Sequence, residues 1–143
     1  MRVLRAFIIV IVALGVLLVA SPASAQVSQI SFGQPRLGPE GASVVIPMTV
    51  VCDVGFNLAF GDVGVSQSSG HKLASAFGFF SNNYPGVPCT GAPQAITIRA
   101  FDFSPYAFKL GSAAAFADVT VFNPVTGDLI TKTTDPQVVR ITR

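Results

Sequence analysis

From residue 26 onward, apolar side chains recur at every second position, and clusters of Gly, Pro, Asn and Ser interrupt the pattern every few residues. In residues 43–53, for example, one face of an extended chain carries Val44, Ile46, Met48, Val50 and Cys52. A two-residue period is typical of a β-strand with one buried face, whereas a helix repeats every 3.6 residues. No stretch of this part keeps the helical spacing, so we expect it to fold as strands.

The alternation divides residues 26–143 into seven or eight short strands separated by turns. The predicted ranges are 27–32, 43–53, 56–67, 72–80, 94–103, 112–122, 128–133 and 137–142. This number of evenly spaced strands in one chain of this length predicts an all-β fold, an immunoglobulin-like antiparallel β-sandwich.

Two positions disturb the pattern. Pro47 lacks the N–H that a strand donates to its neighbour, so we expect the strand 43–53 to lie at an edge or to be bulged there. Within 56–67 the apolar positions shift from even to odd numbers at Gly61 and Asp62, which predicts a β-bulge at that point.

The first 25 residues have the three parts of a secretory signal. Arg2 and Arg5 precede an apolar run over residues 6–20, and Ala-Ser-Ala at 23–25 offers the small residues that a signal peptidase requires. The run of about 15 residues is shorter than the ~20 that a membrane-spanning helix needs. We therefore expect a cleaved signal peptide at 1–25, a secreted domain at 26–143, and no membrane span in the mature chain.

Removal of the signal changes the charge balance. Arg2 and Arg5 leave, so nine basic residues become seven, which equals the number of acidic residues in the chain. Nucleic-acid binding depends on Lys and Arg that neutralise phosphates, and the remaining basic residues are scattered. We expect no nucleic-acid partner, and the absence of net charge favours self-association.

Cys52 and Cys89 are the only cysteines, and both belong to the expected secreted part. An even cysteine count in an oxidising compartment predicts a disulfide. The alternative, a redox site of the thioredoxin type, needs a C-x-x-C motif that the chain lacks. In the chain-entropy model, closing a loop of this length stabilises a domain by roughly 4 kcal/mol.

Several short motifs follow one another along the middle of the chain. They are Val63-x-Val65-x-Gln67-x-Ser69-Gly70, Ala74-x-Ala76-x-Gly78, Cys89-Thr90-Gly91-Ala92-Pro93-Gln94, Phe108-Lys109-Leu110-Gly111 and an Ala-x-Ala strand from Ala113. In these motifs the chain resembles small secreted bacterial domains of the actinobacterial type, whose function is not known. The resemblance covers most of residues 52–121. It implies an immunoglobulin-like sandwich with a Cys52–Cys89 bridge, and it implies no activity.

The chain departs from that group in two places. Similar domains often carry a second cysteine pair around the late hairpin, where residues 122–128 contain no Cys. They also prefer Thr or Ser at outward strand positions, where this chain has several Phe. The second departure draws attention to the surface of the sheet.

No group of residues predicts catalysis, a cofactor or a metal site. His71 is the only histidine, and it lies with Ser66, Ser68 and Ser69 around a turn, where Ser and Gly are ordinary turn formers. The carboxylates are dispersed along the sequence, so no pair predicts the two acids of a glycosidase. One His and two Cys are too few for a zinc site.

Aromatic side chains are the most informative surface feature. If the apolar rows of their strands point inward, Phe101, Phe116 and Phe122 point outward, and Tyr84 and Tyr106 lie in nearby loops. Three outcomes stay open: loops cover these rings, the rings form an interaction face, or they bind sugars. The absence of Trp disfavours sugars.

We therefore predict a secreted, non-enzymatic domain with a structural or protein-interaction role. Its interaction face is expected to include Phe101, Phe116, Phe122, Tyr84 and Tyr106, and its partner to be another protein or a second copy. The alternative is a carbohydrate- or cell-wall-binding module that uses the two tyrosines. A hydrolase centred on His71 is the least supported reading.

Overall fold

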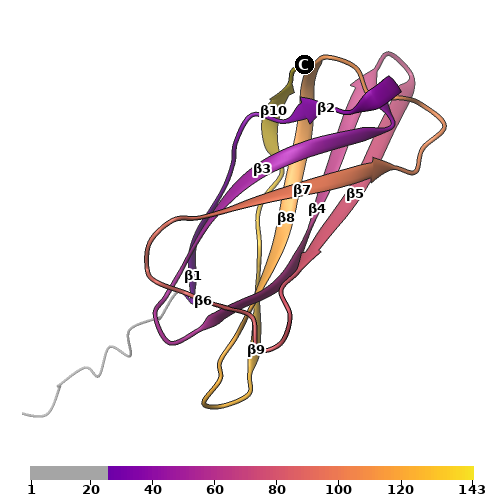
Figure 1. Cartoon of the computed structure of the whole chain (residues 1–143). Coiled ribbons are helices and arrows are strands. Elements are labelled where there is room, and N and C mark those ends of the chain that lie inside the picture. The colour runs from indigo at the N-terminus through magenta and orange to yellow at the C-terminus, as the bar shows by residue number, and fades with distance from the viewer. Residues whose placement is uncertain (1–25) are drawn as a thin grey trace, which may run out of the picture.

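The computed structural model describes residues 26–143 (Figure 1). They form one 3-10 turn, η1 (Pro39–Gly41), and ten strands: β1 (Val27–Phe32), β2 (Arg36–Leu37), β3 (Ser43–Cys52), β4 (Asn57–Ser69), β5 (Lys72–Ser81), β6 (Val87–Pro88), β7 (Gln94–Asp102), β8 (Gly111–Phe122), β9 (Leu129–Thr133) and β10 (Gln137–Ile141). Within this range no helix is long and apolar enough to cross a membrane. The predicted signal peptide, 1–25, lies outside the described residues.

The all-β prediction is confirmed. The eight predicted strands are the eight longest strands observed, and their bounds agree to within two residues. The strands β2 and β6 have only two residues each, which is too short to carry a recognisable period.

All ten strands belong to one sheet. Its main path is β1-β3-β7-β5-β4-β8-β10, while β2 pairs with β3, β6 with β4 and β9 with β8. The pairings are antiparallel, and two of the three longest, β3 with β7 and β4 with β8, join strands far apart in the sequence. Ser43 of β3 stands opposite Phe101 of β7, and Asn57 of β4 stands opposite Phe122 of β8.

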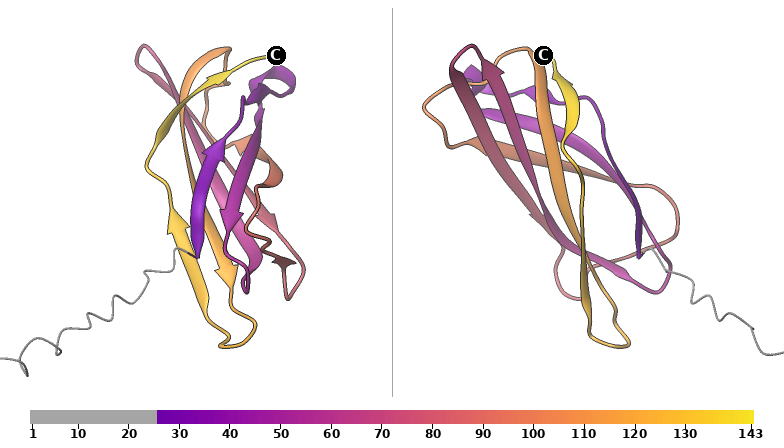
Figure 2. Two further views of the ribbon diagram at one scale, coloured as in Figure 1. Left: turned by 90° about the vertical axis from the view of Figure 1, so that its left-hand side faces the viewer. Right: turned by 180° about the vertical axis from the view of Figure 1, so that it is seen from behind.

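The sheet folds over into two layers. In Figure 1, β3 and β7 cross in front of β4, β5 and β8, and the view from behind in Figure 2 shows the same two layers. They are joined where Ala76 and Phe77 of β5 pair with Asp102 and Phe101 of β7. The sequence predicts two stacked sheets, whereas the structure has one continuous sheet, because this short pairing carries the hydrogen bonds from one layer to the other.

On the opposite side the sheet nearly closes on itself. The Leu37 N–H of β2 donates to the Thr142 carbonyl oxygen (2.8 Å), and the Thr142 N–H donates to the Pro35 carbonyl oxygen (2.9 Å). Farther along this side, the Lys132 ammonium donates to the Val27 carbonyl oxygen (2.8 Å). These bonds fasten the two layers together along the edge that β5 and β7 do not join.

The inward rows of the two layers form a single hydrophobic core. Strand β3 contributes Val44, Ile46, Met48 and Val50, and the facing layer contributes Val63, Val65, Val119 and Val121. Small alanines at 113, 115 and 117 of β8 leave room for the larger side chains of β3. Burying one side chain of the Val or Ile type stabilises a fold by ~1.5–3 kcal/mol, so these rows hold the layers together.

Pro47 is tolerated inside β3 by the way its neighbours are placed. The prediction of an edge strand or a bulge is wrong, because β3 lies between β1 and β7 and its register with β7 is continuous. The Pro47 carbonyl oxygen accepts a hydrogen bond from the Gly33 N–H (2.7 Å), just beyond β1. A residue's N and O point to the same side of a strand, so the missing donor falls in the gap between β1 and β2.

The bulge in β4 lies nearer its start than predicted. The register with β8 shifts between Leu58 and Phe60, so Ala59 is the extra residue. The Asn82 N–H donates to the Ala59 carbonyl oxygen (2.8 Å), and the Asn82 amide group donates to that of Leu58 (2.9 Å). The prediction at Gly61 is wrong, because this glycine serves close packing: a Cβ there would lie 2.4 Å from the Asp118 carbonyl oxygen.

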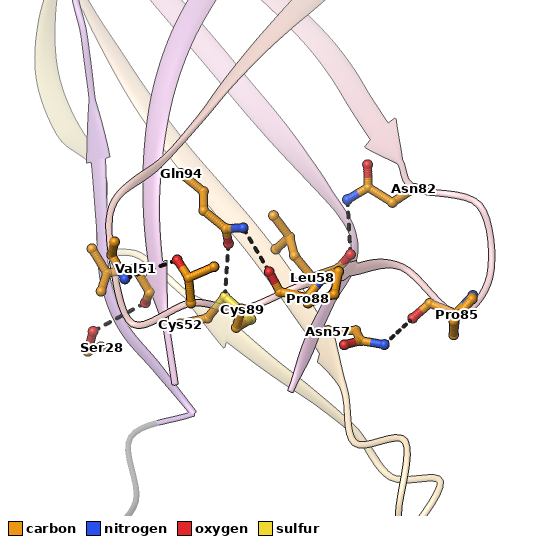
Figure 3. Close-up of a disulfide and its surroundings, with 12 residues drawn as sticks. Ser28, Val51, Cys52, Asn57, Leu58, Asn82, Pro85, Pro88, Cys89 and Gln94 are labelled. Atoms are coloured by element: carbon orange, nitrogen blue, oxygen red, sulfur yellow. Dashed lines mark hydrogen bonds between the residues drawn. A yellow bond between two sulfur atoms is a disulfide. The ribbon is translucent and has the colours of Figure 1, made fainter. Parts of the chain in front are cut away.

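The disulfide between Cys52 and Cys89 is confirmed, and it links the end of β3 to the segment after β6 (Figure 3). Both cysteines are buried. The Cys89 N–H donates to the Phe56 carbonyl oxygen (2.8 Å), and the Gln94 side-chain amide donates to the Pro88 carbonyl oxygen (3.0 Å). The bridge therefore ties the loop 82–93 to the layer that contains β3 and β7.

Candidate functional site

Strand β5 places two phenylalanine rings on the outside of the molecule. Ala76 and Gly78 are buried against the core, so Phe77 and Phe79 point outward. Their exposed fractions are 46% and 74%. Aromatic side chains usually supply the buried area of cores and interfaces, so two successive outward rings need a further explanation.

A row of aromatic residues crosses four strands at the level of Phe77. Phe77 stands opposite Phe101 of β7 on one side and Gly64 of β4 on the other, and Gly64 stands opposite Phe116 of β8. The Phe116 ring covers Gly64, because a Cβ added there would lie 2.3 Å from two of its ring atoms. Cross-strand side chains stand ~5 Å apart, so these rings form one continuous surface.

Six phenylalanines lie on this outer surface, which we call the aromatic face. They are Phe60 of β4, Phe77 and Phe79 of β5, Phe101 of β7, Phe103 just after β7, and Phe116 of β8, and all are at least 40% exposed. Phe103 joins the others because its N–H donates to the Ser75 carbonyl oxygen of β5 (3.1 Å). Of the three outcomes left open by the sequence, cover by loops does not apply to these six rings within residues 26–143.

Two carboxylates stand beside the rings. Asp62 of β4 lies opposite Asp118 of β8 and, on its other side, opposite Phe79. The Thr133 hydroxyl donates a hydrogen bond to the Asp118 carboxylate. Burial, and then the nearby Asp118 charge, raise the pKa of the Asp62 carboxyl. No pair of carboxylates stands out in the sequence, and strand pairing brings these two together across 56 residues.

Strand β7 leaves the outer surface directly after its junction with β5. Its pairing with β5 consists of Ala76 opposite Asp102 and Phe77 opposite Phe101. A Cβ on the next residue of β5, the buried Gly78, would lie 2.6 Å from the Arg99 carbonyl oxygen. The β7 backbone therefore crosses the core side of β5 at this point, whereas Phe79 points outward.

The five predicted interaction residues are divided among three places. Phe101 and Phe116 lie on the aromatic face. Phe122 is partly buried opposite Asn57 at the start of β4, where its ring centre lies 5.5 Å from that of Tyr84. Tyr106 lies at the other end of the β4–β5 hairpin, where the Lys72 ammonium sits 5.4 Å from its ring centre.

A shallow groove of about 360 Å³ adjoins Tyr84. Its apolar lining includes Phe60, Phe122 and Leu129, and its polar lining includes Ser81 and Asn82. Tyr84 is 85% exposed. The two tyrosines of the predicted sugar site stand at opposite ends of a ten-residue pairing, about 30 Å apart at 3.3 Å per residue, so they cannot share one ligand of ordinary size.

The residues around His71 do not assemble a catalytic group. His71 is exposed in the turn between β4 and β5, while Asp62 lies seven residues before the end of β4. At ~3.3 Å per residue that separation is about 20 Å, beyond the reach of a hydrogen bond. Among residues 26–143, no three His, Cys, Asp or Glu side chains are grouped as metal ligands.

The sequence missed part of the aromatic face. The predicted interaction face includes neither Phe77 nor Phe60, whereas both point outward from strands. Counting in twos from Ala74 and Ala76 places Phe77 outward, so that signal was present. To predict that Phe60 points outward, one would have to know of the bulge at Ala59, which reverses the faces of the preceding residues.

Comparison of the chain with protein-family models, with curated proteins and with solved structures gives no significant match. The function therefore has to be argued from the geometry of this face.

Proposed function

We propose that residues 26–143 form an exported, non-enzymatic interaction domain that docks through its aromatic face. The observation that carries the proposal is the gathering of six exposed phenylalanines on one side of the sheet. Six rings of about 200 Å² each, at these exposed fractions, present roughly 700 Å² of apolar surface. The largest apolar patch of a typical monomer is ~300–600 Å², so this surface is large enough to be an interface.

Export is part of the proposal. It is supported by the predicted signal peptide and by the Cys52–Cys89 disulfide, because disulfides persist in oxidising compartments. An immunoglobulin-like classification belongs to the same proposal. Its support is the pair of facing antiparallel layers, while the continuous β5–β7 junction is the feature that an ordinary two-sheet sandwich lacks.

The proposed role is non-enzymatic because of where the polar side chains lie. His71 stands alone in a turn, and the paired carboxylates Asp62 and Asp118 lie on the outer surface of the sheet among aromatic rings. A surface of this kind excludes water only when something covers it.

The alternative is a carbohydrate- or cell-wall-binding module. The groove beside Tyr84 favours it, because an exposed ring next to the Ser81 and Asn82 side chains can stack on a sugar and hydrogen-bond to its hydroxyls. This groove holds far less apolar surface than the aromatic face, and for that reason we place docking first.

Hydroxyl-radical footprinting of the mature chain tests the proposal. The purified chain would be labelled alone at low concentration, at high concentration, and after mixing with culture medium and cell envelope from cells that export it. We expect protection of Phe77, Phe79, Phe101 and Phe103 in at least one of the two latter samples. Protection of Tyr84 and Phe122 alone would favour the carbohydrate alternative, and unchanged labelling of all these rings would contradict docking.

A further inference from the structure

We propose that one end of the molecule binds an acidic polysaccharide. This end, which we call the basic end, lies where β4 and β10 finish and where β5 and β8 begin, at the top of Figure 1. It includes none of the six rings of the aromatic face, so the inference goes beyond the proposed function. It carries five of the seven basic residues of 26–143, all with exposed side chains: Arg36, Lys72, Lys109, Arg140 and Arg143.

Strand pairing gathers basic residues that are scattered along the sequence. Arg140 of β10 pairs near the start of β8, and Lys109 lies just before that strand. Arg36 of β2 forms a β-bridge with Thr142, which directly precedes Arg143. The grouping is therefore a product of the fold, and the order of the residues in the chain does not reveal it.

A buried glutamine fixes the main chain that carries Lys109. The Gln67 side chain is 8% exposed. Its carbonyl oxygen accepts a hydrogen bond from the Lys109 N–H (2.8 Å), and its amide group donates to the carbonyl oxygens of Lys109 (2.9 Å) and Ser112 (3.2 Å). These bonds use only main-chain groups of Lys109, so its ammonium stays at the surface, where a ligand can reach it.

The cations line two hollows. The first, of about 180 Å³, lies between the β4–β5 turn and the loop before β8, and its lining includes Lys72, Lys109 and Tyr106. The second, of about 270 Å³, is lined by Arg140 and Arg143. The two adjoin, because residue 109 lines the first and residue 110 lines the second, and neither has an acidic side chain in its lining. A hollow lined by charges of one sign focuses the electrostatic field, so both attract anionic groups.

The charge of the molecule is divided between its two ends. Two acidic side chains, Glu40 and Asp102, lie near the basic end, and the Asp102 carboxylate accepts hydrogen bonds from the Ser104 N–H (2.8 Å) and hydroxyl (2.7 Å). This end therefore has a net side-chain charge of +3, while two basic and five acidic residues give the rest of the domain −3. A chain without overall charge thus has one cationic end, which an anionic polymer attracts while it repels the other.

The shape of the basic end favours a chain-like ligand over a bilayer. The cations lie in recesses that a polymer with protruding anionic groups can enter, whereas a flat bilayer would cover these recesses without filling them. Tyr106 is 40% exposed, and the Lys72 ammonium lies 5.4 Å from its ring centre. One acidic sugar can therefore stack on the ring and pair with the ammonium. For a domain proposed to be exported, a polysaccharide is also a more accessible polyanion than a nucleic acid.

Binding of the mature chain to a fluorescently labelled heparin oligosaccharide tests the proposal. Heparin is the probe because it is a linear acidic polysaccharide, and fluorescence anisotropy at several NaCl concentrations gives its affinity. Each cation that neutralises an anion of a linear polyanion contributes about 0.7–0.9 to the slope of log affinity against log salt. Five cations therefore predict a loss of affinity of roughly 100-fold or more between 50 and 200 mM NaCl.

Two double variants remove the charges of the two hollows separately. Lys72→Gln with Lys109→Gln neutralises the first hollow, and Arg140→Gln with Arg143→Gln neutralises the second. Each pair is expected to weaken heparin binding at 50 mM NaCl by about tenfold and to reduce the salt slope by about 1.5. Circular dichroism shows whether each variant is folded, and either pair alone is a sufficient test.

Val54→Glu with Val125→Glu is the matched control. It makes the same change of net charge at the opposite end of the molecule, where these side chains are 74% and 90% exposed. Charges separated by more than a Debye length are largely screened, so we expect the control to bind heparin within about twofold of wild type.

Three results would overturn the proposal. They are an absence of heparin binding at 50 mM NaCl, an equal loss of affinity in the control and in the variants of the basic end, and tighter binding per charge to single-stranded DNA or to phosphatidylglycerol vesicles than to heparin. The first two would exclude the basic end as a site, and the third would exclude a polysaccharide as its ligand. None of them bears on the aromatic face, which the footprinting experiment tests.

Discussion

Asp62 lies on the outer surface of the sheet at a level where its nearest charged neighbour is another carboxylate. Its pKa is raised by burial and by Asp118, so the folded chain holds this proton more tightly than the unfolded chain does. Stability contributed by Asp62 is therefore fully present below the ordinary Asp pKa of 3.8 and is lost as the pH rises through the raised value. At neutral pH the ionised side chain works against folding.

Replacing Asp62 by Asn should stabilise the single chain at pH 7. We expect a gain of about 0.2–1 kcal/mol in the free energy of unfolding, the range for cross-strand pairs. We expect this gain to shrink as the pH falls through the raised pKa of Asp62 toward 3.8. Urea denaturation at several pH values measures it. Asp135→Asn removes an exposed carboxylate from the β9–β10 connection and is the control. An Asp62→Asn chain that is less stable than wild type at pH 7 would contradict the assignment.

Side-chain direction was predictable at this scale, and side-chain neighbours were not. The period of two placed Phe101 and Phe116 outward, because each strand alone determines which side chains alternate. Whether Asp62 meets Asp118 depends on the register between β4 and β8, and register follows from long-range packing that no single strand encodes. Phe60 shows the limit most clearly, since one extra residue at Ala59 reverses the face to which it belongs.

The β5–β7 junction is the narrowest part of the sheet. Two residue pairs hold it, and Gly78 sits next to them with the β7 backbone directly against its Cα. A Cβ at Gly78 would lie 2.6 Å from the Arg99 carbonyl oxygen and 2.8 Å from the Ala100 Cα. Backbone atoms of a paired strand cannot move aside without loosening the pairing itself.

Gly78→Ala should therefore destabilise the fold by about 1–3 kcal/mol, the usual cost of overpacking. Gly64→Ala is the matched comparison, because its added Cβ meets only the flexible ring of Phe116. Since Ala is favoured over Gly in a strand by ~0.5–1 kcal/mol, we expect Gly64→Ala to lie within about 1 kcal/mol of wild type. Thermal unfolding followed by circular dichroism compares the two, and equal effects would show that the junction tolerates displacement.

Strand existence was predictable from the sequence, while strand pairing was not. Eight segments with a clear period became eight strands, yet the edge position expected for Pro47 was wrong. The proline was compatible with an interior strand because β1 ends and β2 begins around it. Such a gap between two partners leaves no trace in the residues of β3.

For the molecule as a whole, the disulfide is the one covalent link between distant parts. It joins β3 to the segment after β6, 37 residues further along. A double substitution of Cys52→Ala and Cys89→Ala should lower the free energy of unfolding by roughly 4 kcal/mol, because the unfolded chain regains the freedom of that loop. Urea denaturation of the double variant and of reduced wild-type chain should give similar curves. Free thiols in material isolated from the medium would contradict the bridge and would remove the support that it gives to the proposed export.

The fold class of the whole molecule was predictable from the sequence, but the way in which the sheet closes on itself was not. Composition and period fixed an all-β chain with inward apolar rows, and the cysteine count predicted its bridge. The continuous path through β5 and β7, and the bonds of Thr142 to Pro35 and Leu37 on the opposite side, arise from how the two layers twist against each other. Those contacts are made by backbone groups, which every residue except proline provides alike.

Because Ser43 stands opposite Phe101, β3 has no partner on that side until β7 has been made. A ribosome adds about 5–20 residues per second, so the intervening stretch takes several seconds to emerge, whereas the β4–β5 hairpin between them closes in about 1–10 μs. Throughout that interval the apolar side chains from Val44 to Val50 remain exposed to solvent. We expect the nascent chain to stay incompletely folded for seconds, which is compatible with the proposed export, and to depend on a chaperone that prevents aggregation.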